Sequence, residues 1–96
     1  MCGIAGFIRL GSAGPNLEDV KALWLAQEPR GRDASGLAYL DKDRTTRYMK
    51  MATPVGKMLP QVSDEIWDGI LQSPMAAFHS RQRTQGHESD PANNHP

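Results

Sequence analysis

The sequence predicts a single small domain of the α+β class with a layered structure. The chain has 96 residues, which is enough for one domain with a small core. Apolar segments of strand and helix character follow one another in the order strand, helix, two strands, helix, strand. This order is typical of layered α/β and α+β structures. Residues 82–96 are almost without apolar side chains, and we expect a solvated loop or tail there.

Residues 2–9 (Cys-Gly-Ile-Ala-Gly-Phe-Ile-Arg) predict the first strand. They form an apolar run that is ended by residues 11–15, which contain glycine and proline. Glycine is unfavourable inside a strand on grounds of entropy. The presence of Gly3 and Gly6 therefore indicates that another backbone or a ligand lies close to this strand.

A helix is predicted to follow the first strand. Asn16 is a good N-cap, and the acidic residues after it suit the positive end of a helix. The apolar stripe of this helix consists of Leu17, Val20, Leu23 and Trp24. We expect Pro29 and Gly31 to end the helix.

The rest of the chain predicts a hairpin, a second helix and a last strand. Residues 36–40 and 45–52 form the arms of the hairpin around the polar turn 41–44. A helix is expected over residues 63–72, with an apolar stripe at helical spacing. Residues 75–78 then form a short buried strand that brings His79, Ser80 and Arg81 to its end.

The composition excludes several classes of protein. The chain has 11 basic and 11 acidic side chains and a net charge of zero, so we expect neither a nucleic-acid partner nor an anionic membrane surface. No apolar run approaches the roughly 20 residues that span a bilayer, and the N-terminus lacks a secretory signal pattern. The single cysteine, Cys2, cannot form an internal disulfide, which is typical of the reducing cytoplasm.

Cys2 is the most informative position for chemistry. A small residue after the initiator Met1 allows that methionine to be removed, which leaves Cys2 as the new N-terminus. A thiol has a reference pKa of about 8.5 and a free α-amine one of about 7.7–8.0. The amine of an N-terminal cysteine can therefore accept the thiol proton, so one residue supplies both nucleophile and base. The alternative is that Cys2 is a small apolar residue of the first strand.

Two further segments carry polar groups suited to a site. Residues 30–36 (Arg-Gly-Arg-Asp-Ala-Ser-Gly) lie between a helix and a strand, where functional sites tend to form. Residues 79–86 (His-Ser-Arg-Gln-Arg-Thr-Gln-Gly) follow a buried strand, and a guanidinium fork there suits a carboxylate. The alternative for residues 30–36 is an ordinary capped turn with a surface ion pair. The alternative for residues 79–86 is a polar surface turn.

Two other patterns are weaker. His79, His87 and His95 recur every eight residues, but they do not form a compact metal-ligand motif. Residues 6–11 have the glycine spacing of a phosphate loop but lack the Lys-Ser/Thr pair that such loops require after it. We therefore predict neither a metal site nor a phosphate loop.

Three segments, each with a side chain suited to chemistry, are called below the first (residues 1–6), second (30–36) and third (79–86) polar segments. Taken together, they resemble the class II glutamine amidotransferase family, whose members are N-terminal-nucleophile hydrolases. Residues 1–6 (Met-Cys-Gly-Ile-Ala-Gly) resemble the opening of that family, and residues 30–36 are similar to its Arg-Gly-x-Asp loop. Residues 79–86 match its His-Thr-Arg-x-x-Thr-x-Gly stretch, and residues 94–96 (Asn-His-Pro) match the Asn-x-His-Pro that follows. The resemblance covers the chain from end to end.

The resemblance implies hydrolysis of the side-chain amide of L-glutamine, with no metal or organic cofactor. Cys2 would be the nucleophile, and Arg30 would help to order its surroundings. Arg81 would hold the α-carboxylate of glutamine, with support from Thr84. Gln85 stands where members that make aminosugars carry histidine, and it is expected to be a further substrate contact. The ammonia would pass to an acceptor in a synthase domain, which is either downstream or on a separate chain.

The resemblance also implies the N-terminal portion of the αββα sandwich of the N-terminal-nucleophile hydrolases. Residues 1–96 are expected to be only the first part of such a domain, either truncated or split, and to be nearly inactive alone. The Asn-Gly pair that stabilises the oxyanion in the family, and its acidic residue that binds the substrate amine, would lie beyond Pro96. Two alternatives stay open: a non-catalytic fragment that docks onto a complementary chain, and a different N-terminal-cysteine hydrolase.

Overall fold

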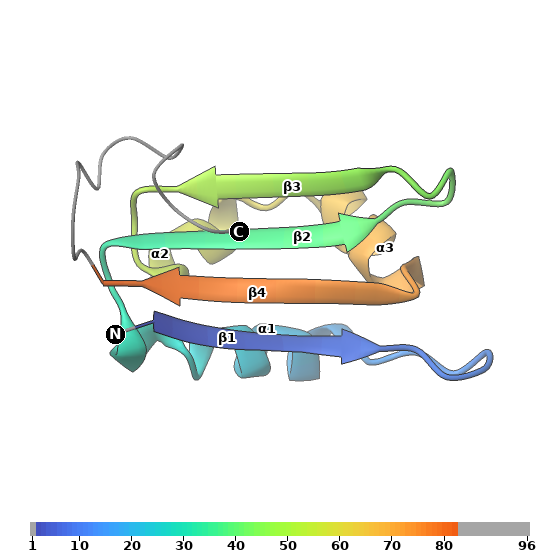
Figure 1. Ribbon diagram of the computed structural model, residues 1–96, viewed down its shortest axis with the longest axis horizontal. Coiled ribbons are helices and arrows are strands. Elements are labelled where there is room, and N and C mark those ends of the chain that lie inside the picture. The colour runs from blue at the N-terminus through green and yellow to red at the C-terminus, as the bar shows by residue number, and fades with distance from the viewer. Residues whose placement is uncertain (1, 83–96) are drawn as a thin grey trace.

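The structure is a computed structural model that describes residues 2–82, and it contains one four-stranded antiparallel sheet with the strand order β1-β4-β2-β3 (Figure 1). The elements are β1 (Cys2–Ile8), α1 (Leu17–Leu25), the 3₁₀ turn η1 (Glu28–Arg30), β2 (Ala34–Leu40), β3 (Thr46–Met51), α2 (Val55–Met58), the 3₁₀ turn η2 (Leu59–Gln61), α3 (Asp64–Gln72) and β4 (Met75–Arg81). The prediction of the α+β class is confirmed.

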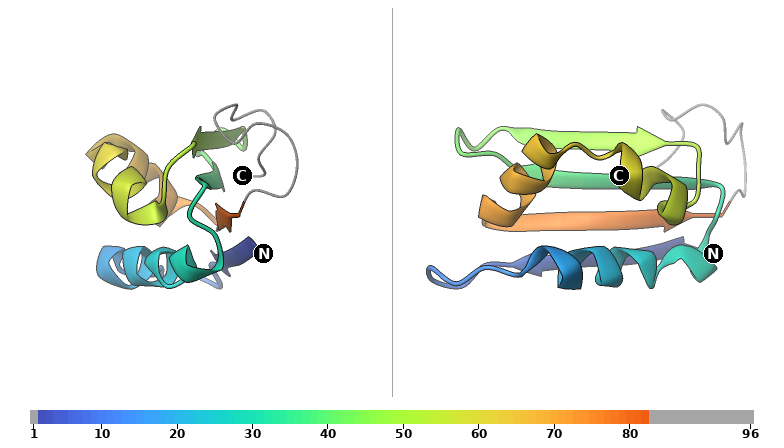
Figure 2. Two further views of the ribbon diagram at one scale, coloured as in Figure 1. Left: turned by 90° about the vertical axis from the view of Figure 1, so that its left-hand side faces the viewer. Right: turned by 180° about the vertical axis from the view of Figure 1, so that it is seen from behind.

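All three helices cover the same face of the sheet (Figure 2). Cross-strand partners in an antiparallel sheet share a face, so the register assigns each strand residue to the helix side or to the opposite side. Leu37 and Phe78 are partners on the helix side, and both are fully buried. The described residues therefore form two layers, a helical layer and a sheet.

Aromatic rings fill the centre of the core between the two layers. Trp24 of α1 contacts Trp67 of α3 and Phe78 of β4, with ring centroids 6.3 Å and 5.3 Å away. Of the two predicted apolar stripes, the second lies wholly in the core or against it, but the first does not. In the first, Val20 and Trp24 are buried, whereas Leu23 is 39% exposed.

The predicted starts of both long helices are confirmed. The side chain of Asn16 accepts a hydrogen bond from the Asp19 amide, and that of Ser63 accepts one from the Ile66 amide. These bonds satisfy amide groups that have no partner within the first turn. The α3 helix ends at Gln72, as predicted.

Three predicted boundaries are wrong. The first helix ends at Leu25 rather than near Pro29, because the chain tightens into η1 before the proline. The second strand begins at Ala34, and β4 continues to Arg81. These strands are longer than predicted because backbone pairing extends them through polar residues, which apolar patterning does not reveal. Residues 55–61 form α2 and η2, which were not predicted.

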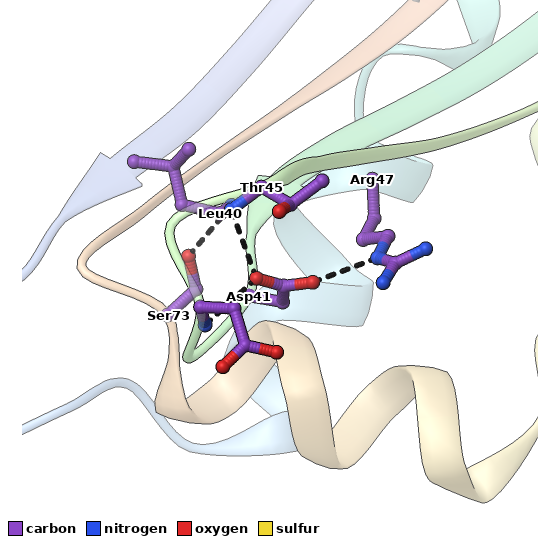
Figure 3. A network of polar contacts seen from close by, with 6 residues as sticks. Leu40, Asp41, Thr45, Arg47 and Ser73 are labelled. Carbon is purple, nitrogen blue, oxygen red and sulfur yellow. Dashed lines mark hydrogen bonds and ion pairs between the residues drawn. The ribbon is translucent and has the colours of Figure 1, made fainter.

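The turn of the β2–β3 hairpin is organised by one carboxylate. Oδ1 of Asp41 accepts hydrogen bonds from the amides of Asp43 and Thr45, both at 2.9 Å, and Oδ2 pairs with Nε of Arg47 at 2.7 Å (Figure 3). Because it accepts these bonds in its charged form, Asp41 has a pKa below its ordinary value of 3.8, with the bond from Arg47 as the main cause.

This pKa shift predicts the pH dependence of unfolding. A carboxyl group with a lowered pKa in the folded state stabilises that state above its unfolded pKa, and this stability is lost as the pH falls through the folded pKa. We expect the free energy of unfolding of Asp41→Asn to fall less than that of the unmodified chain when the pH is lowered below about 4. Urea unfolding between about pH 2 and pH 7 measures this effect. Asp43→Asn in the same turn is the control, and an equal change in both variants would contradict the prediction.

Candidate functional site

The candidate site lies at the end of the sheet where β1 begins and β4 ends. Cys2 and Arg81 are paired residues across these two strands. Both side chains therefore point to the face of the sheet that the helices leave bare. The Cys2 thiol is free and exposed, and Arg81 is half-buried. Antiparallel pairing thus brings the first and third polar segments of the sequence together.

Arg30 reaches the same place from the helical layer. Its Nε donates a hydrogen bond to the main-chain oxygen of Cys2 at 3.2 Å. Arg30 is the last residue of η1, where the amide of Arg30 bonds the oxygen of Gln27 and that of Gly31 bonds the oxygen of Glu28, both at 3.0 Å. The tight 3₁₀ turn therefore sets the position of the Arg30 guanidinium beside the first strand.

The backbone after η1 packs directly on the end of β4. A Cβ atom added to Gly31 would lie 2.3 Å from the carbonyl carbon of Arg81 and 2.4 Å from the nitrogen of Gln82. The amide of Asp33 donates to the oxygen of Arg81 at 2.9 Å. The second polar segment is thus in backbone contact with the third.

A small hollow adjoins this junction. It has a volume of about 360 Å³ and is lined by Pro29, Gly31, Arg32, Asp33 and Gln82. A larger hollow of about 1060 Å³ lies between the hairpin turn and α3, and it contains no residue of the three polar segments. We assign the candidate site to the Cys2 end of the sheet because the exposed thiol and the arginines are there, although the larger hollow is elsewhere.

Not every residue of the second polar segment is part of the site. Ser35 belongs to β2, where it is buried and donates to the main-chain oxygen of Thr53 at 2.7 Å. The expectation of a loop through residue 36 is therefore wrong, because strand pairing already begins at Ala34. Thr84 and Gln85, the other expected substrate contacts, lie outside the described residues, as does Met1.

The histidine series is not brought together by the described structure. His79 is buried, and its main-chain oxygen accepts a bond from Nε1 of Trp24 at 3.3 Å. His87 and His95 lie outside the described residues. Within residues 2–82, no group of three or more His, Cys, Asp or Glu side chains is arranged to hold a metal ion.

None of the helices within residues 2–82 has the length and apolar character needed to cross a bilayer.

Two residues near the site were not singled out from the sequence. Gln27 and Ser80 are joined by a hydrogen bond of 2.5 Å from the serine hydroxyl to the main-chain oxygen of Gln27. Ser80 lay within a polar segment without an assigned role, and Gln27 gave no sequence signal because its backbone makes the contact. The glycine at position 3 was the available clue, since its missing side chain leaves room for both residues.

The arrangement offers an exposed thiol whose strand partner is Arg81 and whose main-chain oxygen is bonded by Arg30. Such a set can attack an electrophilic carbon and bind an anion close to it. Comparison of the chain with protein-family models, with curated proteins and with solved structures gave no match.

Proposed function

We propose that this chain is the N-terminal part of a class II glutamine amidotransferase domain and acts in the cytoplasm. The proposal has two supports. One is the resemblance of residues 1–6, 30–36 and 79–86 to the motifs of that family. The other is the meeting of Cys2, Arg30 and Arg81, one from each motif, at one end of the sheet. The pairing of Cys2 with Arg81 carries the proposal, because residues at opposite ends of the described chain become neighbours there.

In the proposed reaction Cys2 is the N-terminal residue after removal of Met1. Its α-amine accepts the thiol proton while the sulfur attacks the side-chain amide carbon of glutamine. The tetrahedral intermediate collapses, the carbon–nitrogen bond breaks, and the ammonium group of Cys2 returns the proton to the departing ammonia. Water then hydrolyses the glutamyl thioester to glutamate and restores the thiol.

Arg81 binds the α-carboxylate of glutamine in this scheme. A guanidinium group on a long side chain, beside a thiol on a short one, suits a substrate whose carboxylate is several bonds from its amide. Arg30 orders the start of β1 through its bond to the oxygen of Cys2. Thr84 and Gln85 are proposed further contacts, and the ammonia passes to a synthase domain. No metal or organic cofactor takes part in the proposed half-reaction.

The role of Arg81 predicts how Cys2 reacts with two electrophiles. We expect Arg81→Ala to slow labelling of Cys2 by a diazoketone analogue of glutamine about 30-fold or more, since truncating one partner of a charge pair costs about 2–5 kcal/mol. Labelling by neutral iodoacetamide, which has no carboxylate, is expected to change less than threefold (about 0.6 kcal/mol). The labelled residue is identified by peptide mass spectrometry.

The control is Arg32→Ala, which removes an exposed guanidinium from the adjoining loop. We expect this variant to react with both reagents at the rate of the unmodified chain. An equal loss of analogue labelling in both arginine variants would point to general electrostatic attraction and would contradict a carboxylate site at Arg81.

A second candidate function is favoured by the face of the sheet opposite the helices. Ile4, Ile8, Tyr48 and Met75 point away from the helices and are 74%, 70%, 68% and 47% exposed. Single exposed apolar residues are common, but several on one sheet face, with Ile8 and Met75 as direct strand partners, indicate an interface. The occupant that suits it is a separate polypeptide with an apolar sheet face, because sheets pack face to face.

The mass of the intact protein distinguishes the two candidates. The enzymatic proposal requires that Met1 be absent from protein made in cells, because an amide nitrogen cannot act as the base. A chain that retains Met1 and is not labelled by the glutamine analogue would favour the interaction fragment. A chain that lacks Met1 and is labelled at Cys2 would favour the glutaminase.

A further inference from the structure

The last three residues of β4 hold the segment that contains Arg30 at three successive points. The oxygen of His79 accepts a bond from Nε1 of Trp24 at 3.3 Å. The hydroxyl of Ser80 donates to the oxygen of Gln27 at 2.5 Å, and the oxygen of Arg81 accepts from the amide of Asp33 at 2.9 Å. The first and third contacts use the β4 main chain. The middle contact alone depends on the identity of a β4 side chain.

The oxygen of Gln27 connects this middle contact to the candidate site. It accepts the Ser80 hydroxyl and also the amide of Arg30, which is 3.0 Å away. The Arg30 side chain in turn donates to the oxygen of Cys2. A continuous path of three hydrogen bonds therefore runs from Ser80 through Gln27 and Arg30 to Cys2.

Close packing against β1 leaves little freedom in this path. Ser80 is fully buried and is the strand partner of Gly3. A Cβ atom at Gly3 would lie 2.8 Å from the Ser80 hydroxyl and 2.9 Å from Cβ of Gln27. The hydroxyl and Gln27 thus occupy the space beside Gly3, one residue after the nucleophile. A buried hydroxyl in so tight a space costs stability unless it is bonded.

We propose that Ser80 is a positioning residue that holds Arg30 against the main chain of Cys2. This inference rests on the proposed function for the role of Cys2, and it extends that function to a residue with no substrate contact. The hydroxyl fixes the Gln27 carbonyl, which is the acceptor for the first turn of η1. Without the hydroxyl, the Gln27 oxygen keeps the bond from the Arg30 amide but loses its bond to β4.

Ser35 offers a matched control for Ser80. It is the strand partner of Ser80 on the same face, is equally buried, and donates to a loop carbonyl, that of Thr53, at 2.7 Å. Its bond leads to the β3–α2 connection rather than to η1. Loss of either hydroxyl therefore removes one buried hydrogen bond, but only the loss at Ser80 affects the path to Cys2.

The test compares Ser80→Ala with Ser35→Ala in the 96-residue chain. We expect Ser80→Ala to lower the maximal rate of Cys2 labelling by the diazoketone analogue about 3- to 10-fold, the range of one net hydrogen bond. The analogue concentration that gives half of this rate stays unchanged, because the Arg81 contact remains. Ser35→Ala should leave both values unchanged.

A double-variant comparison shows whether Ser80 acts through Arg30. If it does, adding Ser80→Ala to Arg30→Ala produces no further change, because coupled residues are not additive. Fully additive effects, or equal effects of the two serine variants, would overturn the inference.

Two measurements without glutamine chemistry separate this inference from the proposed function. Ser80→Ala, but not Ser35→Ala, should speed hydrogen exchange of the Arg30 amide. Ser80→Ala should also change the rate of Cys2 alkylation by iodoacetamide. This change should be absent when Ser80→Ala is combined with Arg30→Ala. If the diazoketone fails to label Cys2 but both results hold, the glutaminase proposal fails and the positioning role stands. If exchange and alkylation are both unchanged, the positioning role fails.

Discussion

Replacing Cys2 by alanine is expected to abolish covalent labelling by a glutamine-analogue electrophile and any release of glutamate from glutamine. Cys2 is the only cysteine of the chain, so no other thiol can take over the attack. Removal of a covalent nucleophile lowers turnover by several orders of magnitude, on the order of 10⁶ where it has been dissected. Labelling is followed by the mass of the intact protein, and glutamate by a coupled assay.

The Cys2→Ala variant should lose its reactivity toward the electrophile but keep its fold. The Cys2 side chain is exposed, and substitutions at exposed positions usually change the free energy of unfolding by no more than about 0.5 kcal/mol. An unchanged urea midpoint is therefore the control. Labelling that persists undiminished in Cys2→Ala, at any residue, would refute the proposed reaction.

Replacing Gly31 by alanine is expected to have the largest effect on stability. Its Cβ would overlap the main-chain atoms of Arg81 and Gln82, which cannot move aside as the tip of a side chain can. Gly31 has an extended backbone with φ of −177°, so the cost arises from this contact and not from its conformation. We expect a loss of about 3 kcal/mol or more, at the upper end for overpacked sites. Urea unfolding measures it.

Gly14→Ala is the matched control for this variant. The atoms nearest to a Cβ at Gly14 belong to the guanidinium group of Arg9, which is the flexible end of a side chain. We expect this substitution to cost less than about 1 kcal/mol. If both alanine variants are equally stable, the packing of residue 31 on β4 is not the tight junction described above.

The Gly31 variant also tests how the fold supports the site. Gly31 packs against the peptide bond between Arg81 and Gln82. Arg30, the residue before Gly31, donates a hydrogen bond to the oxygen of Cys2. Forcing the loop away from β4 should therefore move Arg30 away from Cys2 and disturb the end of β4 that carries Arg81. Labelling by the glutamine analogue is expected to fall more steeply than labelling by iodoacetamide in whatever fraction of this variant stays folded.

Local sequence signals predicted most of the secondary structure. The N-cap Asn16 and the two apolar stripes located both long helices, and the N-cap role of Ser63 emerged only from the structure. The apolar run after Cys2 located β1, and residues 36–40 and 45–52 located the hairpin. Such signals are reliable because caps and periodicity act within a few residues. Where pairing or packing between distant segments sets a boundary, as at Ala34 and Arg81, the prediction was wrong.

The sequence by itself determined the residue types of the candidate site and the order in which they occur. It supplied a cysteine at position 2, an arginine-containing turn after the first helix and an arginine after a buried strand. It also placed glycine at position 3, which allows close approach to β1. These features are local, and each is visible within a few neighbouring residues.

Only the tertiary structure decided which of these groups meet. Antiparallel pairing of the first and last strands makes Cys2 and Arg81 neighbours, and the contact of Ser80 with Gln27 is made by a side chain and a distant carbonyl. Strand order and register also left Ile4 and Ile8 exposed on the face of the sheet opposite the helices. Local patterns do not encode these outcomes, because strand order and register follow from how the whole core is buried.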